Sequence, residues 1–254
     1  MLKNVNVSII TPNYNSGKYI EETILSVINQ TYKSWEMIIV DDCSTDNSVN
    51  ILQGAAKQDD RIKLILLKKN LGAAKARNEA LKIAKGPFIA FLDSDDLWEP
   101  EKLEAQIGLM IKNNYPISYT QYSVFKEDPS RYKYTIKVPD CLDYSGYLKN
   151  TIIGMSTAII NKEIVGEFSF YNIRSRQDAY LWITLLKRGY IAYGIHKNLT
   201  KYRLRKESVS ANKLKAAKMV WFLYFNLEKL GFLKASYYFG CYAYNATLKR
   251  VINK

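Results

Sequence analysis

Short apolar runs alternate with amphipathic stretches through the first part of the chain. Polar residues end each run, which is typical of short buried strands. Between the runs, apolar residues recur at helical spacing, as with Ile20, Ile24, Val27 and Ile28. Strands that alternate with helices of this length indicate a parallel sheet with right-handed crossovers. We therefore predict strands at 5–11, 35–40, 62–67 and 87–92, and helices at 18–30, 48–57 and 71–84.

The second half of the chain has a less regular pattern. It predicts β-rich segments at 117–138, 155–160 and 190–203, and helices at 144–149 and 177–188. Residues 211–254 form a basic, aromatic tail, in which Gly231 separates two amphipathic helices too short and polar to span a bilayer. We expect one α/β domain over 1–210, divided near residue 98, followed by this helical tail.

Polar residues gather where three predicted strands end. Asp93, Asp95 and Asp96 follow one strand directly, and Pro100 then begins a helical pattern. Residues 11–15 and the pair Asp41-Asp42 end two other strands. In open α/β sheets, ligands bind at this edge. Clustered carboxylates repel one another, so they favour a hard divalent cation that also holds phosphate oxygens. The alternative is a solvated turn, with an acid stabilised near a helix start.

Composition narrows the class of partner. The net charge of +13 favours an anionic partner, which leaves nucleic acid, a phosphate-bearing substrate or an anionic membrane. Cys43, Cys141 and Cys241 are too far apart to indicate a disulfide framework or a zinc site, and His196 is the only histidine. The chain starts in a strand pattern, so we expect no secretory leader and a cytoplasmic location. The sequence has no Gly-x-Gly-x-x-Gly and no P-loop, which argues against a dehydrogenase and a P-loop kinase.

Six short motifs make the chain resemble glycosyltransferase family 2, whose members have the GT-A fold. Each motif is weak alone, but the six occur in the expected order within about residues 4–210. They are VSIITPNYN at 7–15, VDDCSTD at 40–46, GAAKARN at 72–78, LDSDD at 92–96, QDxxLW at 177–182, and YR with two later serines at 202–210. The resemblance implies a Rossmann-like, mostly parallel central sheet flanked by helices.

The resemblance implies that the first half of the domain binds the nucleotide of a UDP-sugar donor. Thr11, Pro12 and Tyr14 would line the uracil pocket, where Tyr14 could stack on the base. Asp42 would accept a hydrogen bond from the uracil N–H, and Arg77 would face the base or the diphosphate. Ordinary turn chemistry is the alternative for Tyr14 and Asp42. A solvated helix position is the alternative for Arg77.

The acid cluster corresponds to the DXD-type motif of the family. Asp93 and Asp95 would lie near the ribose and the metal, and Asp95 or Asp96 would bind Mn²⁺ or Mg²⁺. The metal would neutralise charge on the departing UDP. Asp178 is the expected general base, which removes the proton of the acceptor hydroxyl as the sugar is inverted. The alternative for Asp178 is a helix N-cap.

The chain departs from the family pattern at two positions. Cys43 stands where the family has glycine, so we expect a turn that does not require a positive φ. Arg205 stands where a histidine often follows the Tyr-Arg pair. Arginine does not ligate metals, but it pairs well with phosphate oxygens.

The resemblance therefore implies an inverting, metal-dependent glycosyltransferase. It would move a hexose-type sugar from a UDP-sugar to a glycan on a polyprenyl-diphosphate lipid, as in O-antigen or capsule synthesis. A sugar-phosphate nucleotidyltransferase is the first alternative. An RNA-binding module is the second, although the chain lacks an RNA-recognition signature and we expect no nucleic-acid partner.

The tail is expected to dock the enzyme on an anionic membrane, peripherally on the inner face of the cell membrane. From residue 213 to the end it carries seven Lys and one Arg against Glu228 alone, with ten aromatics interleaved. Basic amphipathic helices of this kind suit the headgroup region. The alternative is a helical hairpin packed on the catalytic domain, or on a second subunit in a homo-oligomer.

Overall fold

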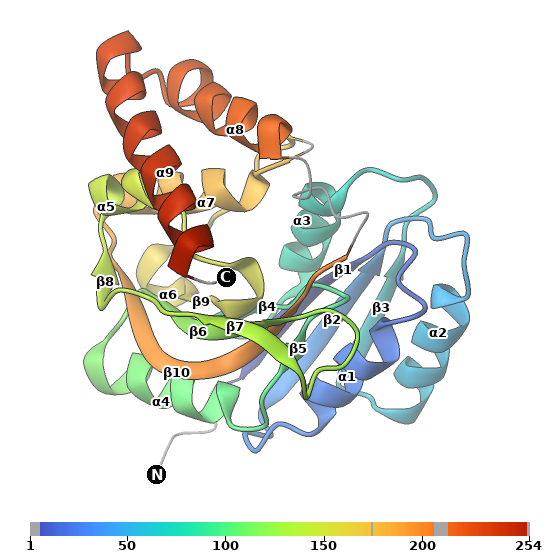
Figure 1. The fold of residues 1–254 in the computed structure, drawn as a ribbon. Helices are drawn as coiled ribbons and strands as arrows, with labels where there is room; N and C mark the ends of the chain where they lie inside the picture. The colour runs from blue at the N-terminus through green and yellow to red at the C-terminus, as the bar shows by residue number, and fades with distance from the viewer. Residues whose placement is uncertain (1–5, 174, 206–212, 253–254) are drawn as a thin grey trace.

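The computed structural model describes residues 6–173, 175–205 and 213–252. Its strands, in chain order, are β1 (Val7–Asn13), β2 (Trp35–Asp41), β3 (Ile62–Leu66), β4 (Phe88–Phe91), β5 (Leu97–Trp98), β6 (Ile117–Phe125), β7 (Tyr132–Ile136), β8 (Cys141–Leu142), β9 (Ile159–Asn161) and β10 (Ala192–Arg203). They form one mixed sheet in the order β3-β2-β1-β4-β9-β6-β10-β5, with β7 beside β6 and β8 beside β10 (Figure 1). β1 to β4 are parallel to one another, and β9 runs antiparallel between β4 and β6.

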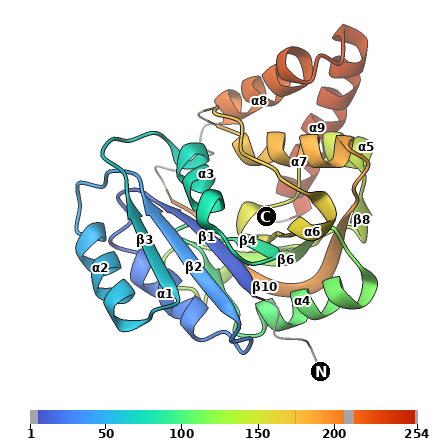
Figure 2. The ribbon, with the colours of Figure 1, turned by 180° about the vertical axis from the view of Figure 1, so that it is seen from behind.

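Helices cover both faces of this sheet (Figures 1 and 2). They are α1 (Ile20–Ile28), α2 (Ser48–Gln58), α3 (Ala73–Ile83), α4 (Lys102–Asn113), α5 (Tyr144–Lys149), α6 (Lys162–Val165), α7 (Gln177–Lys187), α8 (Lys213–Phe222) and α9 (Phe232–Ile252). A 3₁₀ turn spans Met155–Thr157, and a π-helical turn, Leu223–Leu227, continues α8.

Two hydrophobic cores follow from the alternation of side chains along the central strands. Ile9 and Ile39 pack in the core shared with α1, α2 and α4. Ile10 and Ile38 point to the opposite face, where the core includes residues of α3, α5, α7 and the tail helices. The continuous apolar runs of the sequence are thus explained, because the central strands are buried on both faces.

The tail folds back as a helical hairpin against α5 (Figures 1 and 2). Tyr224 is fully buried and donates a 2.6 Å hydrogen bond to the Leu148 carbonyl. Asn245 donates to the Lys149 carbonyl at 3.0 Å. Gly231, with φ of 76°, immediately precedes α9, so the break between the two arms lies where the sequence predicts it. The hairpin therefore packs on the catalytic domain, which is one of the alternatives that the sequence left open.

The predicted fold class is confirmed, and most predicted elements are found within a few residues of their expected ends. The predicted helix start at Pro100 is wrong, because α4 begins at Lys102 and Pro100 lies in the preceding turn. Of the predicted strand at 155–160, the first part is the 3₁₀ turn. The boundary at 210/211, Ser208 and Ser210 lie outside the described residues. None of the helices in the described ranges has the length and hydropathy needed to cross a bilayer.

Candidate active site

The three polar strand ends meet at one edge of the sheet. β1 lies between β2 and β4, and Asn13 at the end of β1 pairs in register with Asp41 at the end of β2. The Asn13 amide donates to the Asp41 carboxylate at 2.7 Å, and the Ser44 hydroxyl donates to the same oxygen at 2.6 Å. Parallel strands put their carboxyl ends at one edge, so the sequence pattern alone predicted this meeting.

Asp42 fixes the loop that leads into α3. Its two carboxylate oxygens accept hydrogen bonds from the backbone N–H groups of Leu71 and Gly72, each at 2.7 Å. The carboxylate is buried and already holds one donor on each oxygen. A uracil N–H at Asp42 would therefore share an oxygen that also positions the start of α3.

The turn after Asp42 requires a positive φ, contrary to the expectation from the sequence. Cys43 has φ of 65°, in the left-handed region that glycine adopts without strain. The physical reason is the tight return of the chain, in which the Ser44 N–H donates back to Asp41 at 2.9 Å. Cysteine at this position carries a conformational cost that glycine would not.

The three predicted uracil-pocket residues differ in how far they are exposed to solvent. Thr11 is completely buried, and Pro12 is partly exposed. Tyr14 is 47% exposed just beyond the end of β1, so its ring has room to stack on a planar ligand. Of the three, Pro12 and Tyr14 present side-chain surface at the edge of the sheet.

Arg77 is not the solvated helix residue that the alternative interpretation required. It is buried on α3, and its Nη2 donates to Asp93 Oδ1 at 2.5 Å. Its Nε is buried and has no hydrogen-bond partner within the described residues. The guanidinium lies 5.4 Å from the ring of Phe170. An inward-facing cation with an unsatisfied donor is suited to a phosphate ligand.

Asp96 is the innermost acid of the cluster. It is fully buried, and its carboxylate accepts hydrogen bonds from the Ser156 hydroxyl at 2.6 Å and the Arg203 N–H at 2.9 Å. Burial, followed by the charges of Asp95 and Asp93, raises the pKa of Asp96 well above its ordinary value. The structure therefore places Asp96 as an internal anchor, with both oxygens engaged by the protein.

Asp95 lies nearer the surface and faces Arg205. The Arg205 Nη1 is 3.2 Å from Asp95 Oδ2, and Arg203 Nε donates to the Asp95 carbonyl at 2.8 Å. Both guanidinium groups lie over the ring of Tyr19, at 5.1 and 4.8 Å. Burial and the charge of Asp93 raise the pKa of Asp95, and Arg205 partly offsets this. Asp95 is thus a carboxylate in an environment that favours a neighbouring positive charge.

Sequence reasoning missed Ser156, Tyr19 and the contacts of Arg203. Ser156 also accepts a 3.1 Å hydrogen bond from the Asp93 N–H, so one hydroxyl ties two acids of the cluster together. Arg203 belongs to the Tyr-Arg motif, so the sequence offered a reason to consider it. No motif or pattern marks Ser156, because its hydrogen-bond partners lie far away in the sequence.

Asp178 is in the first turn of α7 and is not the helix N-cap. The N-cap position is Arg176, which has a left-handed φ of 61° and no capping side-chain bond. Arg176 Nη2 donates to the hydroxyl of Tyr242 on α9 at 3.1 Å. Within the described residues, no hydrogen bond engages the Asp178 carboxylate. The N-cap alternative is therefore wrong, and Asp178 is partly exposed.

The loop before α7 is joined to the nucleotide half by Phe170. The Asn78 side chain on α3 donates to the Phe170 carbonyl and accepts from its N–H, both at 2.8 Å. Arg77, one residue earlier, faces the Phe170 ring. The segment that carries Asp178 is thus attached to the helix that carries the arginine of the acid cluster.

The donor chemistry of the cluster fits Mn²⁺ or Mg²⁺. Asp93 and Asp95 offer carboxylate oxygens, which these cations prefer, and each is paired with an arginine whose contact a cation would share. In the described part of the chain, no three His, Cys, Asp or Glu side chains enclose a metal by themselves. A cation here would be held by one or two protein carboxylates, with phosphate oxygens completing its shell.

This sheet, with a cluster of acids and two arginines at its carboxyl edge, has the GT-A fold. The model of the family described as "Glycosyl transferase family 2" matches residues 8–178, and the chain belongs to this family. It is 49% identical over 245 residues to TuaG of Bacillus subtilis (strain 168), named as a teichuronic acid biosynthesis glycosyltransferase, with 96% of this chain and 97% of TuaG covered.

A second relative has a more specific name. The chain is 42% identical over 217 residues to the Escherichia coli UDP-Glc:alpha-D-GlcNAc-diphosphoundecaprenol beta-1,3-glucosyltransferase WfgD, with 85% of this chain and 83% of WfgD covered. Solved structures share the fold at lower identity. The mannosyltransferase PcManGT of Pyrobaculum calidifontis, in complex with GDP-Man and Mn²⁺, is 20% identical with a TM-score of 0.70, covering 94% of this chain and 70% of that one. S. aureus TarS with UDP-GlcNAc is 21% identical with a TM-score of 0.69, covering 87% and 67%.

Proposed function

We propose that this enzyme transfers a sugar, with inversion, from a UDP-sugar to a glycan carried on a polyprenyl diphosphate. The acceptor would be an intermediate of surface polysaccharide synthesis, and the enzyme would work on the inner face of the cell membrane. The observation that carries the proposal is the convergence of Arg77 and Arg205 on Asp93 and Asp95, at the sheet edge where the exposed Tyr14 follows β1. The name of WfgD supports this class of donor and acceptor, and the name of TuaG supports a role in polysaccharide synthesis.

The nucleotide would lie across the ends of β1, β2 and β4. Tyr14 would stack on the uracil, with Thr11 and Pro12 behind it and Asp42 as acceptor for the ring N–H. Arg77 would turn its unsatisfied Nε toward the diphosphate, and Arg205 would exchange part of its contact with Asp95 for phosphate oxygens. Arginine suits this exchange because its planar fork pairs with carboxylate and phosphate alike.

Asp95 would hold Mn²⁺ or Mg²⁺, with Asp93 beside it. A bound divalent cation would neutralise charge on the departing UDP. We assign Asp96 the task of anchoring the cluster, because both of its oxygens are engaged within the protein. Ser156 and Arg203 then fix the direction in which the cluster faces.

Asp178 would act as the general base. Its carboxylate stands in the first turn of α7. It would take the proton of the acceptor hydroxyl as that oxygen attacks the anomeric carbon from the face opposite UDP. The C–O bond to UDP breaks as the new glycosidic bond forms, which inverts the configuration.

The test is turnover of labelled UDP-sugars, offered singly with Mn²⁺ and a synthetic polyprenyl-diphosphate glycan. Asp178→Asn should lower kcat by roughly 10²-fold, because general-base help is typically worth that much. UDP affinity by calorimetry should stay near that of the wild type. Glu163→Gln, an exposed acid in the first turn of α6, is the matched control and should leave both values unchanged.

Two results would contradict this assignment. Near-normal turnover by Asp178→Asn, together with lost UDP binding, would make Asp178 a donor contact instead of a base. Turnover of a nucleoside triphosphate with a sugar phosphate, and none of a UDP-sugar, would replace transfer by nucleotidyl chemistry.

A further inference from the structure

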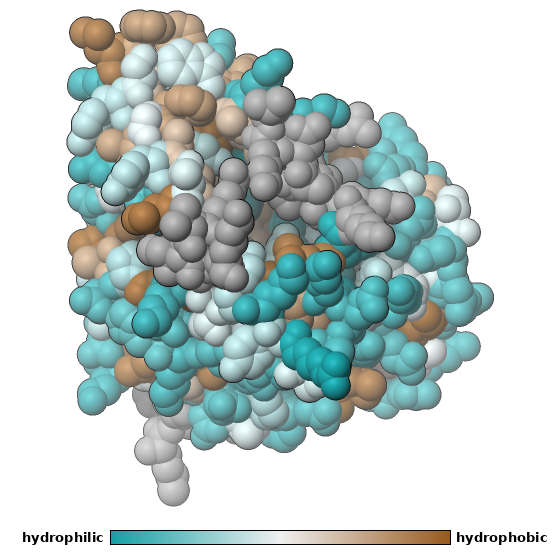
Figure 3. Space-filling model, in the orientation of Figure 1, coloured by the Kyte–Doolittle hydropathy of each residue, from teal (hydrophilic) through white to brown (hydrophobic). Residues whose placement is uncertain are grey.

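The connection between the arms of the tail hairpin carries apolar side chains that the protein leaves uncovered. We name residues 225–234 the hairpin tip. Phe225 is 40% exposed, Phe232 is 66% exposed and Leu233 is 83% exposed. Figure 3 shows apolar atoms gathered at the top of the molecule, where Figure 1 places the junction of α8 and α9. Side chains of this size are not left in water without cost, so the tip is a candidate docking surface.

The outward charge of the hairpin tip is positive. Lys229 and Lys234 are exposed, and neither pairs with an acid in the described part of the chain. The single acid of the tail, Glu228, is buried and faces inward. It pairs with Lys187 at 2.5 Å and accepts a 2.7 Å hydrogen bond from Tyr144. The tip therefore presents apolar and cationic groups together, with its negative charge neutralised on the protein side.

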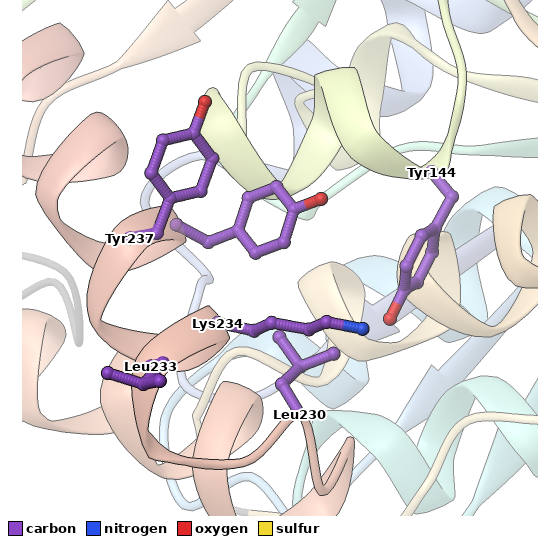
Figure 4. A pocket seen from close by; sticks show the side chains of 6 residues that line it. Tyr144, Leu230, Leu233, Lys234 and Tyr237 are labelled. Atoms are coloured by element: carbon purple, nitrogen blue, oxygen red, sulfur yellow. The ribbon is translucent and has the colours of Figure 1, made fainter.

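A hollow of about 360 Å³ lies beside the tip, between α5 and α9. It is lined by Tyr144, Leu230, Leu233, Lys234, Tyr237 and Tyr238. Figure 4 shows the Lys234 ammonium reaching across the hollow toward the Tyr144 hydroxyl. The Tyr144 hydroxyl already donates to Glu228. The Lys234 ammonium beside an apolar floor is suited to a phosphate headgroup whose acyl chains continue past Leu233.

We propose that the hairpin tip inserts into an anionic lipid bilayer, with a headgroup phosphate in the hollow at Lys234. This rests on the proposed function in one respect, which is that a lipid-linked acceptor has to be met at a membrane. Insertion of the tip differs from a mode of docking in which both helices lie flat in the headgroup region. Val220, Leu223, Tyr224 and Ala235 are fully buried in the hydrophobic core, so part of the apolar face of each arm is already used.

Co-sedimentation of the full chain with lipid vesicles tests the proposal. Mixed phosphatidylcholine–phosphatidylglycerol vesicles should bind the protein, pure phosphatidylcholine should bind it poorly, and added salt should weaken binding. The double substitution Phe232→Ser and Leu233→Ser should weaken binding roughly tenfold or more, since each large apolar side chain favours hydrocarbon by about that factor. Lys229→Gln with Lys234→Gln should weaken it by at least roughly fivefold on anionic vesicles only.

A matched control lies on α4, where Ile111 and Lys112 are also exposed. Ile111→Ser with Lys112→Gln should leave vesicle binding unchanged. UDP affinity and the thermal midpoint, measured for every variant, separate failed docking from failed folding and from failure of the proposed function. All four substituted tip positions are exposed, so the variants should fold.

Three outcomes would overturn the proposal. The wild type fails to bind anionic vesicles, or the tip variants bind them as well as the wild type does, or binding ignores lipid charge. Ultracentrifugation decides the main rival. If the chain forms a dimer that the Phe232/Leu233 substitution dissociates, and vesicles are not bound, the tip is a subunit interface.

Discussion

At the turn after β2, Cys43 stores strain within a few residues of the proposed uracil pocket. A left-handed conformation costs a residue with a Cβ about 1–2 kcal/mol. Glycine avoids that cost, although it loses about 0.4–1 kcal/mol through the greater freedom of the unfolded chain. The sequence showed the cysteine but not the backbone angle, because φ is fixed by the hydrogen bonds between Ser44 and Asp41.

Cys43→Gly should therefore raise the free energy of unfolding, by about 0.5–1 kcal/mol. Urea denaturation of the purified protein measures it. Cys43→Ala removes the thiol but keeps the left-handed strain, so it is the control and should give no gain. A destabilised Cys43→Gly variant would show that the thiol contributes packing that outweighs the strain.

Among single residues, the place of Asp93, Asp95 and Tyr14 at the sheet edge was predictable, because each follows the end of a strand. It was not predictable where a partner comes from a distant segment. Nothing near Ser156 indicates that its hydroxyl will bond to Asp93 and Asp96. Nothing near Arg77 indicates that its helix position is buried, since an arginine on an alanine-rich helix is usually solvated.

At the scale of elements, α4 contains a buried lysine that has no carboxylate partner within the described residues. Lys102 is fully buried, and its Nζ donates to Gln106 Oε1 at 2.6 Å and lies 4.3 Å from the centre of the Trp98 ring. Burial lowers the pKa of Lys102 well below its ordinary value. The helix thus carries a group that binds its proton less tightly in the folded protein than in the unfolded chain.

This predicts that stability rises with pH between the lowered pKa of Lys102 and the ordinary lysine value near 10.5. In that window the unfolded chain holds the proton that the folded protein has released, so the slope is positive, at most about 1.4 kcal/mol per pH unit. Lys102→Met should be more stable than the wild type at the lower end of the window, and the difference should vanish toward its upper end.

Urea denaturation at a series of pH values measures this slope. Lys112→Met, an exposed lysine on the same helix, is the control and should track the wild type throughout. Parallel pH profiles for the wild type and Lys102→Met would mean that the ammonium stays charged in the fold.

The first four strands and three helices could be predicted because their signal is local. Each element shows its hydrophobic periodicity within its own residues, and the crossovers between parallel strands are right-handed. The 3₁₀ turn and β9 were harder, because the short apolar run around Ile159 has no period of its own. Its antiparallel place between β4 and β6 depends on the whole sheet.

At the scale of the molecule, the tail hairpin is part of the body that positions the proposed base. Tyr242 on α9 accepts a hydrogen bond from Arg176, the left-handed residue just before α7. Left-handed non-glycine residues persist only where surrounding structure holds them. Through the Tyr242 hydroxyl, the hairpin therefore contacts Arg176, which lies two residues before Asp178.

Tyr242→Phe should lower kcat roughly three- to tenfold, because small misplacement of a reacting group reduces rate steeply. The KM for the UDP-sugar and the thermal midpoint should change little, which separates positioning from general loosening. Tyr244→Phe, an exposed tyrosine on the same helix, is the control. Equal losses in kcat and in thermal midpoint would instead indicate a purely structural contact.

The buried position of Asp96 also has a consequence for how the chain folds during synthesis. Its two hydrogen-bond donors, Ser156 and Arg203, lie 60 and 107 residues further along the sequence. An emerging amino-terminal half would have to bury this carboxyl group before either donor has left the ribosome, at the cost of an unsatisfied polar group. The nucleotide half should therefore stay open around β4 until β10 has been made. The contacts of Asp96 with Ser156 and Arg203 are then among the last to form during folding, and also among the slowest.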